Sequence, residues 1–577
     1  MSDGPARGMK GRLTAYGDPG FSFYLRKAFA KSMGYTDDEL GRPIIGIANT
    51  FSDLVSCQGT APQLVEAVKR GVIAAGGLPL EFPTISLGEP FLTPSSMLLR
   101  NLLAMDTEEA VRRQPMDAVV LIGGCDKIVP AQLMAVASAD IPAISVVTGP
   151  MMTGSYRGER LGACTDCRRF WMEHRGGRVG EEEIDVISGR LCPTAGTCMV
   201  MGTASTMACV TEALGMMLPG GAAIPAVNAD RFRHAQESGL RAVRLAAEDL
   251  RPSRIMTPKA FTNALRVLLA IGGSTNGIIH LTAIARRRGI AIDFEAFDRM
   301  SRETPVLVDL KPNGQHYMED LNRAGGLLPV LRELKPLLHL DCVTVSGRTL
   351  GEEIEAGPAP FPQDIVRPRA QPIYAEGGLA VLRGSLAPDG AIIKQSAATP
   401  RLLRHEGRAV VFSSLEDIIA RLDDDRLNIT PDDVLVLQNA GPKGAPGMPE
   451  AGYLPIPKRL ARDGVKDMVR LSDARMSGTA FGTVVLHVSP EAADGGPLAL
   501  VRTDDRIRLD VEARRIDLLV DEAELGRRRA AWQPPPPHEG AERGYLKLYL
   551  DHVEQAHQGC DFDFLTATEM RETAPVL

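Results

Sequence analysis

The chain has 577 residues, 44% of them hydrophobic, and a formal net charge of -7 at pH 7. This length exceeds what one hydrophobic core usually supports, so two or more domains are predicted. The negative charge and the lack of any Lys/Arg block argue against a nucleic-acid partner and favour a small molecule. The first seven residues lack the apolar core of a signal peptide, and no later run is long and apolar enough to span a bilayer. We therefore expect a soluble cytoplasmic protein without a membrane partner.

The N-terminal part alternates apolar strands with helices. Strands are predicted at residues 43–50 and 143–148, and the stretches 83–90 and 118–127 each predict a strand followed by a loop, the first loop holding Glu89. A helix with apolar spacing of three and four follows at 61–75, and another begins near Pro94. This alternation predicts an α/β fold with a doubly wound parallel sheet in an α/β/α domain, whose ligands gather at the carboxyl ends of the strands.

A proline-rich stretch at residues 357–372 is the best candidate for a linker. We therefore divide the chain into an N-terminal domain (1–356), this linker, and a C-terminal domain (373–577). Short strands separated by turn residues predict a mainly-β, barrel-like second domain. These strands lie at residues 408–412, 433–437, 482–488 and 506–511. Past the prolines at 534–537, an amphipathic tail at 545–565 is expected to dock on a neighbour.

The strand at 118–127 ends in side chains of unlike chemistry. Its apolar run stops at two glycines, and Cys125, Asp126 and Lys127 follow without a gap. A thiolate suits iron or zinc, whereas a carboxylate suits magnesium or manganese. A chain that offers both at the end of one strand could hold two unlike metals side by side.

The cysteines do not indicate a disulfide framework, because the nine are odd in number and irregularly spaced. Metal ligation, catalysis and plain burial remain open. Cys198 precedes a helix, whose N-terminus would favour a thiolate. Cys164 and Cys167 have a spacing typical of zinc or redox sites. Another turn, at residues 271–276, enters a helix and either offers backbone N–H groups to an anion or is merely structural.

Five segments carry a family resemblance. They are residues 49–57 (NTFSDLVSC), 123–127 (GGCDK), 196–198 (GTC), 441–450 (GPKGAPGMPE) and 473–479 (DARMSGT). Together they resemble the dihydroxy-acid and sugar-acid dehydratase family over essentially the whole chain. The tail, with GY at 544–545, HVE at 552–554 and DFDFL at 561–565, looks more like the sugar-acid branch of pentonate and hexonate dehydratases.

The resemblance implies an iron-sulfur cluster of the 2Fe-2S type held by Cys57, Cys125 and Cys198. Three protein ligands leave one iron position open, which makes the iron a Lewis acid rather than an electron carrier. Cys164 and Cys167 match none of the family's cluster positions, so we assign them no ligand role.

The resemblance also implies a Mg²⁺ site formed by Glu89, Asp126, Lys127 and Glu450, in which the lysine is carbamylated. Carbamylation needs the neutral amine, so we expect Lys127 to be poorly solvated and its pKa to be lowered. The alternative is an ordinary salt bridge from Lys127 to Asp126 or Glu89. Because Glu450 comes from the second domain, the site should lie between the domains.

Ser477 matches the family's catalytic base, and Thr479 could donate a hydrogen bond to it or to the substrate. The alternative is a serine that only caps a helix or turn. Candidate substrate contacts are Ser274, Lys443, Arg475 and, through the tail of a neighbouring subunit, His552.

These residues predict a hydro-lyase that converts a 2,3-dihydroxy carboxylate, such as arabinonate, xylonate or gluconate, to the 2-keto-3-deoxy acid. Magnesium would bind the carboxylate and the 2-hydroxyl, Ser477 would remove the proton at carbon 2, and iron would take the 3-hydroxyl. We expect a homodimer or homotetramer. Three alternatives remain: dehydration of branched-chain dihydroxy acids, dehydration of phosphorylated gluconate, and an iron-sulfur electron carrier or sensor.

Overall fold

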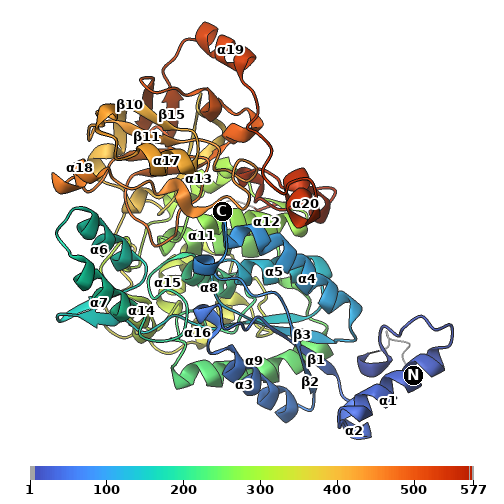
Figure 1. Cartoon of the computed structure of the whole chain (residues 1–577). Helices are drawn as coiled ribbons and strands as arrows, with labels where there is room; N and C mark the ends of the chain where they lie inside the picture. Colours follow the sequence, from blue (N-terminus) through green and yellow to red (C-terminus); the bar gives the residue numbers. More distant parts are fainter. Residues whose placement is uncertain (1–6, 571, 575–577) are drawn as a thin grey trace.

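The structure of the protein is a computed structural model that describes residues 7–570 and 572–574. Figure 1 shows a lower part built around a parallel sheet and an upper part built around a barrel. Residues 1–6, most of the stretch over which we predict no signal peptide, lie outside the described residues. In the described part of the chain, no helix combines the length and the apolar character needed to cross a membrane.

The N-terminal sheet has four strands in the order β2-β1-β3-β4, and all three pairings are parallel. The strands are β1 (Ile44–Asn49), β2 (Leu78–Pro83), β3 (Ala118–Gly123) and β4 (Ala143–Val147). Every residue of β3 is buried, as expected for a strand covered on both faces. The predicted parallel sheet is therefore confirmed.

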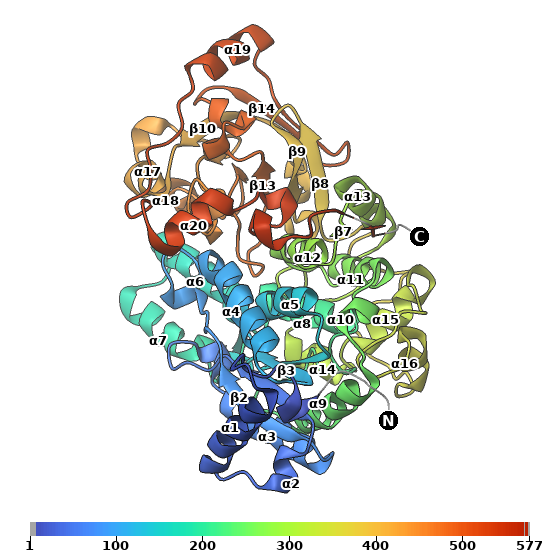
Figure 2. The same cartoon turned by 90° about the vertical axis from the view of Figure 1, so that its right-hand side faces the viewer.

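Helices cover both faces of this sheet. In both views α3 (Ala61–Ala74) and α9 (Ala229–Glu248) lie below the sheet, and α4 (Arg100–Arg113) and α5 (Ile128–Ala139) lie above it (Figure 2). The short strand expected to begin at Pro83 is misplaced, because β2 ends there, whereas Glu89 does lie in a loop after the strand, within a short 3-10 helix at Glu89–Phe91. Gly88 and the prolines at 83 and 90 do not favour a sheet ladder.

The remaining helices of this part surround the same core. They are α1 (Pro19–Ser32), α2 (Asp37–Leu40), α6 (Thr165–Arg175), α7 (Glu181–Leu191), α8 (Thr203–Ala213), α10 (Pro252–Ile255), α11 (Pro258–Ala270), α12 (Asn276–Arg287), α13 (Phe294–Glu303), α14 (Met318–Arg323), α15 (Leu328–Leu334) and α16 (Leu350–Ala356). Two short strand pairs complete it: β5 (Gly154–Tyr156) with β6 (Glu159–Leu161), and β7 (Ile290–Ala291) with β16 (Glu572–Thr573).

The C-terminal part is a closed eight-stranded barrel in the order β10-β11-β12-β13-β9-β8-β15-β14. Its strands are β8 (Ala380–Gly384), β9 (Ala387–Ile393), β10 (Arg404–Phe412), β11 (Val434–Leu437), β12 (Val469–Ser472), β13 (Val484–Ser489), β14 (Arg506–Asp510) and β15 (Arg515–Leu518). Helices α17 (Leu415–Arg421), α18 (Lys458–Arg462) and α19 (Glu522–Ala531) lie outside it. The predicted barrel-like sheet is confirmed.

Two segments join the parts. In the expected linker, Ile365 and Val366 are buried in the hydrophobic core of the N-terminal part, so this stretch is packed rather than free. Helix α20 (Gly544–His552) begins the tail, lies above α4 in both views, and shares a hydrophobic cluster with Met105 of α4 and Ile279 of α12. Its Tyr549 is buried against Met97 and Met448, so the tail docks on its own chain and closes the junction between the two parts.

Candidate active site

The loop after β3 is shaped by close packing. A Cβ on Gly124 would lie 1.9 Å from Oγ1 of Thr148, so only glycine fits there. Cys125 follows with φ of +68°, in the left-handed region that non-glycine residues rarely adopt. Such conformations persist where the surroundings impose them, and they cluster at functional sites. The turn places Cys125, Asp126 and Lys127 between the strand and α5, as predicted.

Three carboxylates surround the amine of Lys127, which is fully buried. Its Nζ lies 2.5 Å from Oδ2 of Asp126, 3.7 Å from Oε2 of Glu89 and 3.7 Å from Oε1 of Glu450. We call Glu89, Asp126 and Glu450 the carboxylate group. Glu450 comes from the barrel part and the other two from the sheet part, which confirms a location between the two.

The lowered pKa expected for Lys127 is wrong for this arrangement. Burial lowers the pKa of the amine and so does Arg475, but the three carboxylates outweigh both, and the pKa is raised above its usual value. The expectation of poor solvation is correct. The pairing of Nζ of Lys127 with Asp126 is the contact that the salt-bridge alternative describes, and carbamylation stays a prediction.

Further side chains hold the carboxylate group in place. Glu89 accepts hydrogen bonds from Oγ of Ser95 at 3.1 Å and from the backbone N–H of Ser96 at 3.1 Å. Glu450 is 3.2 Å from a guanidinium nitrogen of Arg475 and accepts a 3.2 Å hydrogen bond from Nδ2 of Asn276. Burial nevertheless raises the pKa of Glu450. These side chains therefore form a cluster of charged groups that hydrogen bonds and ion pairs hold in place.

The cysteines predicted to hold the iron-sulfur cluster adjoin these charged side chains through Cys125. We call Cys57, Cys125 and Cys198 the thiol group. Hydrogen bonding to Cys57 and burial raise the pKa of the Cys125 thiol, and its Sγ also donates to Oδ1 of Asp126 at 3.2 Å. A hydrogen bond to Cys164 and burial raise the pKa of the Cys198 thiol, and Cys57 makes a smaller contribution in the same direction. Each of the nine cysteines is a free thiol, as predicted.

Cys164, to which we assigned no ligand role, lies next to Cys198 of the thiol group. Its Sγ is 3.9 Å from that of Cys198, and it also hydrogen-bonds to Cys167. Its spacing from Cys167 marked a pair in the sequence, but that spacing could not show that the pair borders Cys198.

The turn at residues 476–479 carries the predicted base. Oγ of Ser477 and Oγ1 of Thr479 are 2.8 Å apart, as the prediction of a Thr479 hydrogen bond requires. Ser477 is half-buried, whereas Thr479 is only 2% exposed. Asn276 links this turn to the carboxylate group, because its Nδ2 contacts both the carbonyl of Met476 at 3.3 Å and Glu450. The sequence marked the turn at 271–276 but missed Asn276.

The four predicted substrate contacts all have protein partners. Arg475 is fully buried and also bonds to Ser95 and to the carbonyl of Met448. Ser274 is buried with Oγ 2.7 Å from Oγ1 of Thr203. Lys443 pairs with Asp494 at 2.9 Å, and His552 pairs with Asp563 at 2.9 Å at the surface of the tail. Of the four, Arg475 and Ser274 are brought to the site, and their contact with substrate stays a prediction.

The donor set suits the implied metals in chemistry. Hard oxygens converge at one point and thiols gather beside them, which fits magnesium and iron-sulfur ligation. In the part of the chain that the structure describes, no group of three or more His, Cys, Asp or Glu is already arranged to hold a metal ion. The carboxylates converge on the ammonium of Lys127 instead of on a shared vacant point.

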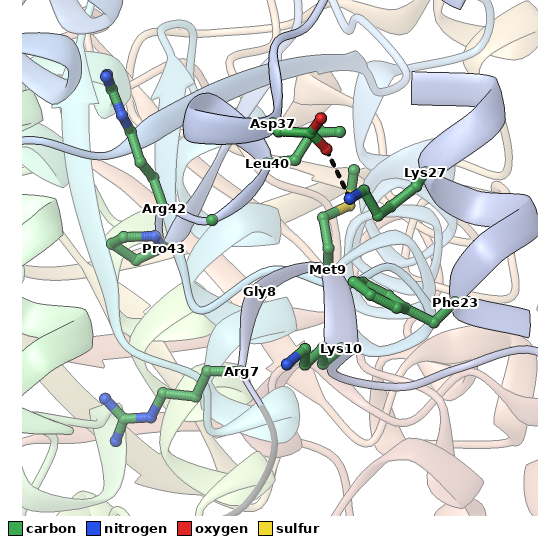
Figure 3. Close-up of a pocket in the computed structure, with 11 residues that line it drawn as sticks. Arg7, Gly8, Met9, Lys10, Phe23, Lys27, Asp37, Leu40, Arg42 and Pro43 are labelled. Atoms are coloured by element: carbon green, nitrogen blue, oxygen red, sulfur yellow. Dashed lines mark ion pairs between the residues drawn. The ribbon is translucent and has the colours of Figure 1, made fainter. Parts of the chain in front are cut away.

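A cavity of about 450 Å³ lies elsewhere, beside α1 and α2 (Figure 3). Lys10, Lys27, Asp37 and Arg42 are among its lining residues, and Lys27 pairs with Asp37 across it. None of the predicted site residues lines this cavity, so size alone does not mark the active site.

Both parts of the chain match models of one known protein family. Residues 42–353 match the family model described as dihydroxy-acid/6-phosphogluconate dehydratase N-terminal, and residues 364–560 match its C-terminal counterpart. The chain is 49% identical over 560 residues to L-arabonate dehydratase of Azospirillum brasilense, with 95% of each chain covered.

Two further relatives are similar over nearly their whole length. L-arabinonate dehydratase of Rhizobium leguminosarum bv. trifolii (strain WSM2304) is 48% identical, with 95% of each chain covered. 6-Deoxy-6-sulfo-D-gluconate dehydratase of Pseudomonas putida is 46% identical, with 94% of this chain and 93% of the relative covered. The chain therefore belongs to the dihydroxy-acid/6-phosphogluconate dehydratase family.

Proposed function

We propose that this protein dehydrates a five- or six-carbon sugar acid, a 2,3-dihydroxy carboxylate, to its 2-keto-3-deoxy acid. The observation that carries the proposal is the junction of three groups of unlike chemistry: the thiol group, the carboxylate group and the Ser477 turn. The names of the three relatives, two arabinonate dehydratases and a sulfogluconate dehydratase, favour a sugar acid as substrate.

In this proposal Ser477 removes the proton at carbon 2. A hydroxyl is too weak a base in water, but hydrogen bonds from Thr479 would stabilise the alkoxide that must form. Arg475 and Asn276 hold Glu450 next to the serine turn. The position of the base relative to the carboxylate group is therefore fixed. Loss of the proton and of the 3-hydroxyl gives an enol, which tautomerises to the keto acid.

Cys57, Cys125 and Cys198 would hold a 2Fe-2S cluster, and Glu89, Asp126, Glu450 and a carbamylated Lys127 would hold Mg²⁺. When bound, these groups would supply Lewis acidity for the leaving hydroxyl and for the substrate carboxylate. The ion pair of Lys127 gives a reason for carbamylation: the ammonium occupies the point on which the carboxylates converge. Converting that amine to a carbamate would replace a cation with an oxygen ligand.

A substrate panel on anaerobically purified protein tests the proposal. We expect turnover of L-arabinonate or another aldonic acid to exceed turnover of 2,3-dihydroxyisovalerate by at least about tenfold, which corresponds to 1.4 kcal/mol. Preference for dihydroxyisovalerate would instead assign the chain to branched-chain synthesis. Reversible one-electron cycling with no dehydration of any acid would favour an electron carrier.

The finer description of the fold belongs to the same proposal. The strand order β2-β1-β3-β4 reverses direction beside β1, which supports a doubly wound sheet with its ligands at that switch point. The domain limits 1–356 and 373–577, the cytoplasmic location and a homodimer or homotetramer remain predictions.

A further inference from the structure

Lys394 is a buried amine that the proposed chemistry does not use. It follows directly after β9 (Ala387–Ile393), and its side chain is fully buried. Among the described residues no carboxylate pairs with it, and burial alone lowers its pKa to about 7. Burying an amine without a counter-charge costs free energy. Because this burial lowers the stability of the fold, we looked to function for the role of Lys394.

Within the part of the chain that the structure describes, the hydrogen bond made by this amine leads to the serine turn. Nζ of Lys394 donates to the carbonyl oxygen of Gly478 at 3.3 Å. That carbonyl belongs to the peptide unit between Gly478 and Thr479, and the N–H of the same unit points at Oγ of Ser477 at 3.4 Å. The amine and the serine oxygen therefore lie at opposite ends of one peptide dipole.

Other contacts fix the turn but do not act on this peptide unit. Asn276 donates to the carbonyl of Met476 at 3.3 Å, and Oγ1 of Thr165 donates to the carbonyl of Thr479 at 2.9 Å. Gly478 is closely packed, because a Cβ there would lie 2.6 Å from Cβ of Ser274, so a larger residue does not fit at this position. Lys394 is thus the side chain that holds the carbonyl of the unit whose N–H faces Ser477.

We propose that Lys394 is a positioning residue for Ser477, acting through the Gly478–Thr479 peptide. Its amine fixes the plane of that peptide and polarises it, since hydrogen bonds in a chain strengthen one another in a low-dielectric interior. The N–H then stabilises negative charge on Oγ of Ser477, and the 3.4 Å contact shortens when that charge forms. This inference rests on the proposed role of Ser477 as the base.

The Lys394→Met variant tests the proposal because it keeps the length of the side chain and removes the donor. We expect kcat to fall by about tenfold to a hundredfold, less than loss of a direct oxyanion donor, with KM within twofold. The rising limb of kcat against pH should move to higher pH, because the serine hydroxyl would ionise less readily. Iron and magnesium content should be unchanged, and Tm should be equal or higher, because an uncompensated buried amine is gone.

Thr165→Val is the matched control. It removes a donor to the neighbouring carbonyl, on a peptide unit whose N–H bonds to the backbone carbonyl of Ser477 at 3.0 Å and not to its Oγ. We expect this variant to lose some stability without the shift of the pH profile. A Lys394→Met variant with lower Tm, wild-type kcat and an unmoved pH profile would show that the lysine is only structural.

A Ser477→Ala variant measured alongside separates the two proposals. If Ser477→Ala is inactive while Lys394→Met has wild-type kinetics, the serine base stands and the role of Lys394 is wrong. If Ser477→Ala retains activity, the base itself is misassigned, and the inference about Lys394 falls with it. A Lys394→Gln variant, which keeps a shorter donor, should lie between methionine and wild type in kcat.

Discussion

The thiol group and the carboxylate group touch each other, yet their charges are balanced differently. The carboxylates converge on a buried ammonium and a buried guanidinium, so their charge is largely matched within the protein. Among the thiols, a hydrogen bond to Cys57 and burial raise the pKa of Cys125, and a hydrogen bond to Cys164 and burial raise the pKa of Cys198. The carboxylate group is thus organised before any ion arrives, whereas the thiol group must lose protons to bind iron.

Cys125→Ser is the change that tests the thiol group most severely. It removes one of the three thiols proposed to hold the cluster, so we expect the cluster and all measurable activity to be lost. The visible absorption and iron content of anaerobically purified protein measure the first effect. Cys209→Ser, in a buried cysteine of α8, is the matched control and should keep the colour. A brown, fully loaded Cys125→Ser protein would show that the cluster is held elsewhere.

Ser477→Ala should leave the thiol group and the carboxylate group intact and stop dehydration of the substrate. Removing a general base costs about a hundredfold to ten-thousandfold in rate, so we expect a loss of kcat in that range. Iron content, magnesium content and Tm should stay at wild-type values. Ser489→Ala, in a buried barrel serine that donates to the carbonyl of His487, serves as the control. Equal rates for the two variants would remove Ser477 from the mechanism.

Lys127→Met tests the balance within the carboxylate group. Three carboxylates would lose the cation on which they converge, and breaking a buried pair in this way costs on the order of 3 kcal/mol of folding stability. We expect a lower Tm, loss of magnesium binding and an unchanged visible spectrum. Calorimetry with and without magnesium measures the first two. Loss of the cluster in this variant would show that the two groups are not separable.

The sequence anticipated the sheet, the barrel and the meeting of Cys125, Asp126 and Lys127, because buried apolar runs and strand ends are local patterns. It did not anticipate the raised pKa of Lys127, because the sequence does not show that the attraction of the carboxylates outweighs burial and the repulsion of Arg475. The contacts of Asn276 and Cys164 were missed because their partners are distant in sequence. The strand misplaced at 83–90 was a local error, in a stretch rich in proline and glycine.

Asn276→Ala should have the smallest effect of these changes and reports on the link between the carboxylate group and the serine turn. Asn276 donates to Glu450 and to the carbonyl of Met476, and each lost hydrogen bond is worth about 1 kcal/mol. We expect kcat to fall by about tenfold to thirtyfold, with cluster content unchanged and magnesium affinity slightly weakened. Asn263→Ala, in a buried asparagine of α11 bonded to the carbonyl of His339, removes a similar group away from the site. If both variants lose stability but keep wild-type kcat, Asn276 has only a structural role. The carboxylate group would then keep its position relative to Ser477 without this side chain.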